Sequence, residues 1–196
     1  MIPLSIFFII KGSFFFIFFL SSIFFGTIYE WHNITKEKLL HKFLGIVFLA
    51  LSFYSAFYFR ENYGLVFFMF IIVICISTDI GGYIFGKIFN GPKLTKISPK
   101  KTYAGMIGSF ILAIVTGYSY VKFTSEIEIS QLEILLIIFF ISFISQIGDL
   151  LISYFKRKAK IKHTSNIIPG HGGLLDRIDG LIFVFLILYL FNFISI

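Results

Sequence analysis

Residues 63–86 read YGLVFFMFIIVICISTDIGGYIFG, a run in which Asp79 is the only charged side chain. A membrane-spanning α-helix needs about 20 mostly apolar residues, and this run supplies them with its carboxylate near one end. A charge within a span is costly, so it usually faces the bundle interior or a wet cavity. The run therefore predicts a transmembrane helix that presents Asp79 to a polar site or pairs it with a nearby lysine.

Apolar runs of similar length lie on both sides of this one. The 196-residue chain is 58% hydrophobic and has a mean hydropathy of +0.94, which is typical of an integral membrane protein. No recurring strand pattern, repeat or linker is visible, so we expect one membrane-embedded domain over residues 1–196. The expected fold is an all-α, polytopic helix bundle with about six transmembrane helices, at about 4–29, 43–59, 63–86, 102–121, 131–152 and 178–196.

The basic residues predict the orientation. Fourteen of the 17 Lys and Arg residues lie in the first, third and fifth connections between the expected helices. The positive-inside rule makes this side cytoplasmic, which places the protein in the cell inner (cytoplasmic) membrane with its polar site facing the cytoplasm. The loops account for the net charge of +7, so we expect the lipid bilayer and no nucleic acid as a partner. The single Cys75 excludes an intrachain disulfide and a CxxC motif.

All four aspartates fall in polar islands near that face: Asp79, Asp149, Asp176 and Asp179. Asp176 and Asp179 are three residues apart, so on a helix they share one face and repel unless a cation or basic groups neutralise them. Carboxylate ligands together with substrate phosphates suit Mg²⁺. The number of carboxylates also leaves room for a second, monovalent cation.

Glycines and a Ser-Pro pair accompany the first island. Gly82 and Gly86 are four residues apart and share a helix face, which favours close helix packing. Ser98 followed by Pro99 predicts a helix start with Ser98 as the N-cap. Lys100 and Lys101 in the first turn, with free backbone N–H groups, would then form an anion site. The alternative is a basic loop that sets topology or touches anionic lipid head groups.

The last island is the densest in special residues. Basic side chains at 156–162 precede glycines at 170, 172 and 173, which allow a ligand to approach the backbone closely. His171 could ligate zinc, but no partner stands at metal spacing, so a phosphate contact or a structural hydrogen bond is favoured. The simpler alternative for the island is a helix cap with ordinary ion pairs.

Together these motifs resemble the signature of the phosphatidate cytidylyltransferase (CDP-diacylglycerol synthase) family. The matching residues are Ser153-Tyr-Phe-Lys156-Arg157, Lys162 and Pro169-Gly-His-Gly-Gly-Leu-Leu-Asp176-Arg177-Ile-Asp179. Gln146-Ile-Gly-Asp149, and Asp79 with Ser98-Pro-Lys-Lys-Thr102, match the family in the same order, so the likeness covers residues 77–181. His163 stands where the family pattern has an aspartate, and the chain has fewer N-terminal helices than many relatives.

The resemblance implies a reaction and its partners. Phosphatidate attacks the α-phosphorus of CTP, giving CDP-diacylglycerol for phospholipid biosynthesis and releasing pyrophosphate, with Mg²⁺ as the cofactor. The nucleophile is already anionic, so positioning and charge neutralisation are the main requirements. A homodimer is the default expectation for a closed oligomer.

The resemblance also implies residue roles. The expected metal ligands are Asp149, Asp176 and Asp179. The expected catalytic set is these three aspartates with Lys156, Arg157 and Arg177. The expected substrate-binding set is Asp79, Ser98, Lys100, Lys101, Thr102, Ser153, Lys162, His171, Gly172 and Gly173.

Three alternatives stay open at this point. One is CTP-dependent activation of another lipid phosphate, such as a polyprenyl or ether lipid. Another is an inactive homologue, suggested by His163. The third is a transporter or channel, which would place acidic residues near the membrane midplane on repeated helices.

Overall fold

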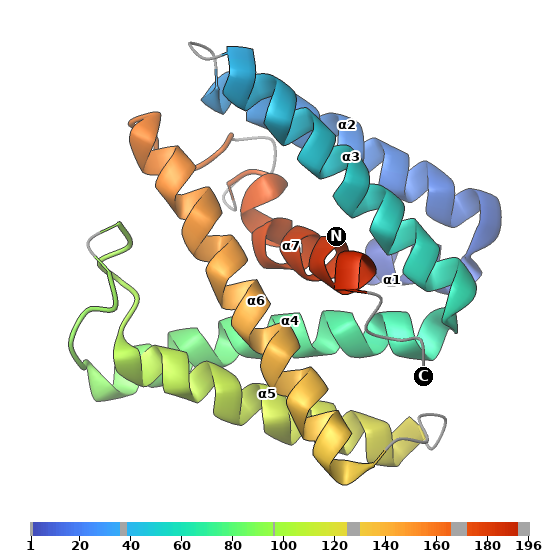
Figure 1. Cartoon of the computed structure of the whole chain (residues 1–196), viewed down its shortest axis with the longest axis vertical. Coiled ribbons are helices and arrows are strands. Elements are labelled where there is room, and N and C mark those ends of the chain that lie inside the picture. The colour runs from blue at the N-terminus through green and yellow to red at the C-terminus, as the bar shows by residue number, and fades with distance from the viewer. Residues whose placement is uncertain (1, 36–38, 96, 125–129, 166–171, 192–196) are drawn as a thin grey trace.

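The computed structural model describes residues 2–35, 39–95, 97–124, 130–165 and 172–191. These ranges contain helices and no strand, which confirms the all-α prediction (Figure 1). The helices are α1 (Ile2–Lys11), α2 (Ser13–Ile34), α3 (Leu39–Asn62), α4 (Gly64–Phe89), α5 (Tyr103–Thr124), α6 (Gln131–Lys158) and α7 (Leu175–Phe191).

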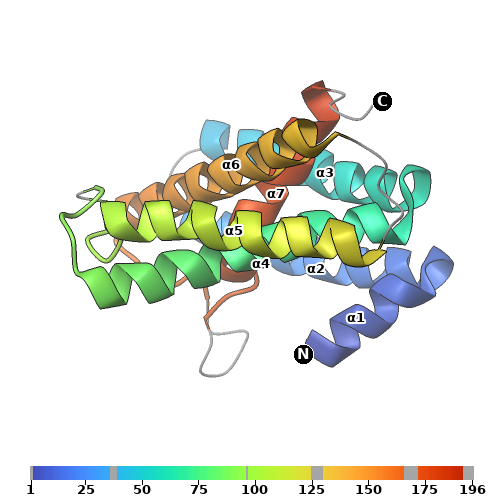
Figure 2. The same cartoon turned by 90° about the horizontal axis from the view of Figure 1, so that it is seen from below.

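The expected single helix over 4–29 is wrong, because the chain breaks there into α1 and α2. Gly12 and Ser13 have φ of 63° and 47°, and such left-handed backbone cannot continue a right-handed helix. Figure 2 shows α1 as a short separate helix set at an angle to α2. Among the described residues, five helices, α2 to α6, are long and apolar enough to cross a membrane. Helix α7 contributes 17 described residues, and the end of the expected 178–196 helix lies outside the described part of the chain.

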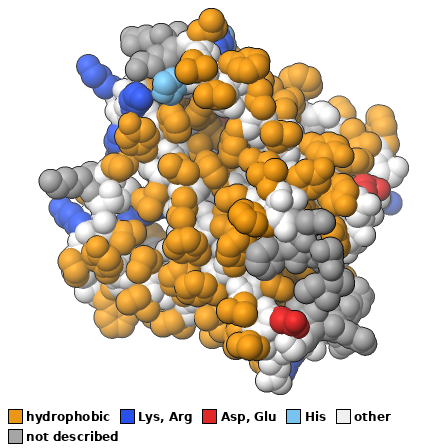
Figure 3. All heavy atoms as spheres, in the orientation of Figure 1, with side chains coloured by type: hydrophobic (Ala, Val, Ile, Leu, Met, Phe, Trp, Pro, Cys, Tyr) orange, Lys and Arg blue, Asp and Glu red, His pale blue; other side chains and the backbone are white. Residues whose placement is uncertain are grey.

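The connections that carry most of the basic residues lie at one end of the bundle. In Figure 1 the ends of α2, α4 and α6 and the starts of α3, α5 and α7 all lie toward the left. On the face drawn in Figure 3, hydrophobic side chains cover most of the surface, and most of the Lys and Arg side chains gather along that same left edge. The arrangement is that of a helix bundle with an apolar girdle and one basic end.

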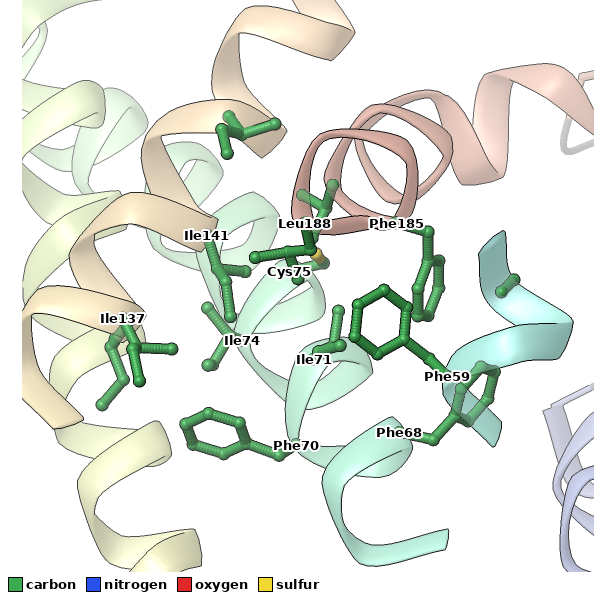
Figure 4. Close-up of a cluster of buried hydrophobic side chains, with 14 of the residues drawn as sticks. Phe59, Phe68, Phe70, Ile71, Ile74, Cys75, Ile137, Ile141, Phe185 and Leu188 are labelled. Atoms are coloured by element: carbon green, nitrogen blue, oxygen red, sulfur yellow. The ribbon is translucent and has the colours of Figure 1, made fainter. Parts of the chain in front are cut away.

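Helix α4 lies at the centre of the hydrophobic core. Phe70, Ile71 and Ile74 on this helix are fully buried. The rings of Phe68 on α4 and Phe185 on α7 stack at 5.1 Å, as Figure 4 shows among the side chains around them. This packing fixes α7, which carries two of the four aspartates, against the helix that carries Asp79.

Helices α4 and α5 pack closely through small residues. A Cβ atom at Gly81 would lie 2.5 Å from the carbonyl oxygen of Gly108, and one at Gly105 would lie 2.7 Å from that of Gly82. The predicted packing role of the glycine face is confirmed, since Gly82 and Gly86 both lie against α5. Close backbone approach of this kind is a common way for membrane helices to associate.

We predict that Gly81→Ala lowers the thermal unfolding temperature in detergent. The added methyl group meets a backbone atom that cannot move aside cheaply, and overpacking of this kind typically costs about 1–3 kcal/mol. Gly91→Ala is the matched control, because its Cβ would make only an ordinary contact of 3.5 Å with Ala104. Equal unfolding temperatures for the two variants would contradict the proposed helix contact.

Candidate active site

A polar cavity of about 550 Å³ opens at the basic end of the bundle, between α4, α6, α7 and the α4–α5 connection. All four aspartates of the chain line it. Five basic side chains face them across the same space. The lining residues are Asp79, Ser98, Pro99, Lys100, Asp149, Lys156, Arg157, Lys162, His163, Asp176, Arg177 and Asp179.

A second cavity of about 320 Å³ adjoins the first between α4, α5 and α6. The two share Asp79, Ser98, Lys100 and Asp149 in their walls. The second cavity adds apolar side chains, among them Leu94, Met106 and Leu150. The larger cavity is thus lined mainly by charged side chains, and the smaller one by both polar and apolar side chains. Asp79 and Asp149 line both.

Two glycines bring the aspartates of α6 and α7 together. A Cβ at Gly180 would lie 2.3 Å from the Ser145 hydroxyl oxygen, and one at Gly148 would lie 3.0 Å from the carbonyl oxygen of Asp179. Each glycine neighbours an aspartate in sequence, so the close crossing of the helices places Asp149 beside Asp179. These two carboxylates are near enough to repel each other, and Asp79 is near both.

Asp149 has the best-defined partners of these three. The ammonium group of Lys101 lies 2.5 Å from one carboxylate oxygen, and the Ser153 hydroxyl donates to the other at 3.3 Å. No hydrogen bond to Asp79 is present within the described segments. Asp179 is only 8% exposed and accepts a hydrogen bond from the backbone N–H of Gly180. Among the described residues, Lys101 is thus the cation in direct contact with this group of three carboxylates.

Asp176 is bound differently. Lys156 donates to one oxygen at 2.7 Å, and the N–H groups of Thr164 and Gly173 donate to the other at 3.0 and 3.2 Å. Burial alone would raise the pKa of Asp176, but these hydrogen bonds and the Lys156 charge outweigh it and hold the pKa below its usual range. Asp176 is thus a charged residue that fastens the described parts of the α6–α7 connection, residues 159–165 and 172–174, to α6.

A belt of hydroxyl groups joins the helices beneath the cavity. The Thr78 hydroxyl donates to the Ser142 hydroxyl at 2.9 Å, and the Ser109 hydroxyl donates to the Thr78 carbonyl at 2.7 Å. Gln146 reaches Ser142 from one turn further along α6 at 3.5 Å. These bonds fix the positions of α4, α5 and α6 along one another, and hence the positions of Asp79 and Asp149.

Residues 40–195 match the sequence model of the cytidylyltransferase family. The chain belongs to the cytidylyltransferase family. The likeness inferred from the motifs is therefore confirmed.

Curated relatives bear the name phosphatidate cytidylyltransferase. One from Rickettsia bellii (strain RML369-C) is 36% identical over 176 residues, which are 85% of this chain and 75% of the relative. One from Bacillus subtilis (strain 168) is 39% identical over 130 residues, 66% of this chain and 48% of the relative. One from Brucella suis biovar 1 is 39% identical over 136 residues, 67% of this chain and 48% of the relative. The aligned region thus covers about half the length of the Bacillus and Brucella relatives.

The predicted helix start at Ser98 is wrong in this cytidylyltransferase-family chain. Helix α5 begins at Tyr103, and the Thr102 hydroxyl accepts a hydrogen bond from the Gly105 N–H, so Thr102 caps it. The chain before it turns back on itself, with the Leu94 N–H donating to the Lys101 carbonyl at 2.8 Å. This closed loop, rather than a helix N-terminus, presents Ser98 and Lys100 to both cavities.

The other predicted substrate-binding and catalytic residues lie as follows. Lys101 and Thr102 line the second cavity, while Lys162 and the catalytic candidates Lys156, Arg157 and Arg177 line the first. Ser153 lies beside Asp149 on α6. Gly172 has a φ of 82° that favours glycine. His171 lies outside the described residues.

Sequence reasoning missed Glu30, which is buried in α2. Its carboxylate accepts hydrogen bonds from both sides of the α6–α7 connection. The available signal was a lone carboxylate directly after the apolar run 4–29, but spacing alone could not pair it with residues more than 130 positions away.

The buried ion pair between Lys156 and Asp176 leads to a stability prediction. Both side chains are 10% exposed, so Lys156→Met leaves a buried, uncompensated carboxylate, which typically costs about 3–5 kcal/mol. We expect Lys156→Met to lower the thermal unfolding temperature and the double variant with Asp176→Asn to recover part of that loss. Lys162→Met, at an exposed position, is the control and should unfold like the parent. Full stability of Lys156→Met would contradict the role of the pair.

Proposed function

We propose that this chain is a phosphatidate cytidylyltransferase, which transfers CMP from CTP to phosphatidate for phospholipid biosynthesis. One observation carries the proposal: a single cavity at the basic end gathers all four aspartates with Lys100, Lys156, Arg157, Lys162 and Arg177. Its membership of the cytidylyltransferase family and the names of its relatives support the choice of substrates.

The proposed step is a displacement at phosphorus. An oxygen of the phosphatidate phosphate forms a bond to the α-phosphorus of CTP, and the bond from that phosphorus to the bridging oxygen of the β-phosphate breaks. The products are CDP-diacylglycerol and pyrophosphate. Since the attacking group is an anion, the protein has to bring two anions together and neutralise them rather than remove a proton.

The basic side chains of the larger cavity suit that task. Arg157, Lys162 and Arg177 line it and present donors for phosphate oxygens. Ser98, Lys100, Lys101 and Thr102 form the opposite wall around both cavities and help to bind nucleotide or lipid phosphate. Gly172 and Gly173 let the α6–α7 connection approach a ligand with backbone groups.

The donor set also fits Mg²⁺. The described residues hold no ready-made group of three His, Cys, Asp or Glu ligands, but Mg²⁺ commonly uses one or two carboxylates with waters and substrate phosphates. Asp149 and Asp179 are the ligands we propose, because both line the larger cavity and their carboxylates are close enough to repel each other. Asp176, which the sequence predicts as a ligand alongside Asp149, stays a predicted ligand, and both its oxygens accept hydrogen bonds from the protein. Bound there, the cation would withdraw charge from the reacting phosphate oxygens.

We place the basic end in the cytoplasm of the producing cell, with the protein in its inner membrane. The concentration of Lys and Arg at that end supports this orientation. CTP would then enter from the cytosol, and phosphatidate would reach the cavity at head-group level. A second, monovalent cation and a homodimer stay predictions.

The direct test supplies purified protein in detergent with labelled CTP, Mg²⁺ and phosphatidate. We expect labelled CDP-diacylglycerol and an equal amount of pyrophosphate, and we expect a chelator to stop the reaction. A parallel arm with a polyprenyl phosphate tests the lipid. Product only in that arm would correct the substrate, and no product with any lipid phosphate would refute the enzyme.

Substitution of the proposed ligands should remove the activity. Asp149→Asn and Asp179→Asn are each expected to lower the rate about 100-fold or more, equivalent to about 2.7 kcal/mol of transition-state stabilisation. Both should raise the Mg²⁺ concentration needed for half-maximal rate. Glu61→Gln, an exposed change at the far end of α3, serves as the control and should behave like the parent. Full activity in both aspartate variants would exclude the metal assignment.

His163→Asp tests the inactive-homologue alternative. The imidazole is 59% exposed and its Nδ1 lies 3.7 Å from an oxygen of Asp176, so the new carboxylate would add charge beside an already satisfied group. We expect the rate to change by less than about tenfold, which is less than the loss in either aspartate variant. A gain of several orders of magnitude would show that the parent chain is impaired.

A further inference from the structure

Glu30 is a fully buried carboxylate on α2, with 0% of its surface exposed. Its Oε1 accepts hydrogen bonds from the Ser165 hydroxyl at 2.5 Å and the Leu174 N–H at 2.8 Å. Its Oε2 accepts from the Thr164 hydroxyl at 2.9 Å and the Leu175 N–H at 2.8 Å. All four donors belong to the α6–α7 connection or the first residue of α7.

No Lys, Arg or His in the described part of the chain forms an ion pair with Glu30. A buried carboxylate without a counter-ion is unfavourable unless hydrogen bonds replace its hydration. Four donors do so here, two of them backbone N–H groups at the N-terminus of α7, where the helix dipole also favours negative charge. The carboxylate therefore depends on this one arrangement of the connection.

The connection is held at the same two places by a second carboxylate. Thr164 and Ser165 lie before residues 166–171, and Gly173, Leu174 and Leu175 lie after them. Glu30 binds side chains on the first side and N–H groups on the second, while Asp176 binds the N–H groups of Thr164 and Gly173. Glu30 and Asp176 thus both link the segment before residues 166–171 to the segment after them.

The space around Glu30 and the α6–α7 connection leaves no room for a side chain at two neighbouring glycines. A Cβ at Gly173 would lie 1.8 Å from the Thr164 hydroxyl oxygen and 2.7 Å from both oxygens of Glu30. One helical turn before Glu30, a Cβ at Gly26 would lie 2.4 Å from a methyl carbon of Leu174. Gly173 therefore has a packing requirement of its own, separate from any approach to a ligand.

Helix α2 is itself firmly placed at this point. The Trp31 indole fills the space beside Gly45 on α3, where a Cβ would lie 1.8 Å from its Nε1. That nitrogen donates to the His41 carbonyl at 3.2 Å, and the indole packs edge-on against Phe155 of α6 at 5.1 Å. The part of α2 that carries Glu30 is thus packed against both α3 and α6.

We propose that Glu30 is a positioning residue: it holds the α6–α7 connection and the start of α7 in the conformation that places Asp176 and Asp179 in the cavity. The inference rests on the proposed function, because these are groups assigned to the site there. Glu30 is not among the described residues that line either cavity. It also lies before residue 40, where the match to the family model begins.

Glu30→Gln is the primary test. The side chain keeps its size, but the amide NH₂ group replaces one carboxylate oxygen and cannot accept the two hydrogen bonds that this oxygen accepts in the parent. We expect kcat to fall about tenfold or more, while the KM for CTP changes less than about threefold because the α5 side of the site is untouched. Hydrogen exchange of the Leu174 and Leu175 N–H groups should accelerate at least tenfold. The exchange measurement needs no catalysis, so it still tests the positioning if the parent chain proves inactive.

Glu133→Gln is the matched control. Glu133 also accepts a backbone hydrogen bond, from the Ser130 N–H in the capping box at the start of α6, but it is exposed and far from the cavity. We expect parental kcat and parental exchange at 174 and 175 from this variant. A fall in kcat equal to that of Glu30→Gln would show a general effect of losing a glutamate cap and would overturn the proposal.

Thr164→Val covers the case in which Glu30→Gln does not fold. It removes one of the four donors without changing side-chain shape. We expect a smaller fall in kcat, about threefold, with faster exchange at 174 and 175. When both single variants fold, the double variant should lose less than the product of the single losses, because the two residues share a contact. Parental kcat and parental exchange in Thr164→Val, or independent losses in the double variant, would refute the positioning role.

Discussion

The structure depends on how acidic side chains are accommodated inside a helix bundle. In a medium of low dielectric constant a carboxylate must be neutralised, hydrogen-bonded or both. Asp149 contacts Lys101, Asp176 contacts Lys156 and two N–H groups, and Glu30 accepts four hydrogen bonds. Apart from the bond between Gly173 and Asp176, these contacts join residues 12 or more positions apart in sequence. Together they determine how α2, α6, α7 and the α4–α5 connection meet at the basic end.

Within this frame the carboxylates divide into two kinds. Asp176 and Glu30 have their oxygens saturated by donors of the protein and act on the backbone around them. Asp79 and Asp179 have few donors and lie close to Asp149. A site for an anionic substrate and a divalent cation needs both kinds of carboxylate. Carboxylates left without protein donors so that they can bind a ligand destabilise the fold, and the hydrogen-bonded carboxylates offset this by fixing the backbone around them. The glycines at the α4–α5 and α6–α7 contacts allow the two kinds to lie side by side.

Much of this was accessible from sequence, for identifiable reasons. Apolar run length predicted the four spans that form α3 to α6, and the motif aspartates predicted part of the cavity lining, since all four line it. The helix break at Gly12 was not predicted, because an isolated glycine in an apolar run is compatible with either continuation or a turn. The start of α5 was misplaced because Ser98-Pro99 satisfies cap preferences that Thr102 fulfils in the structure. Glu30 was missed because its partners are defined only by the tertiary fold.

The position of Glu30 also shows that a domain boundary drawn from sequence similarity can differ from one drawn from hydrogen bonds. Judged by the family model, the domain begins at residue 40, after α2. Judged by hydrogen bonding, it begins at least ten residues earlier, since a chain starting at residue 40 would retain every motif aspartate, lysine and glycine yet leave two hydroxyl groups and two backbone N–H groups without their acceptor. A helix that lies outside the match to the family model can therefore be as necessary to the chemistry as the signature itself.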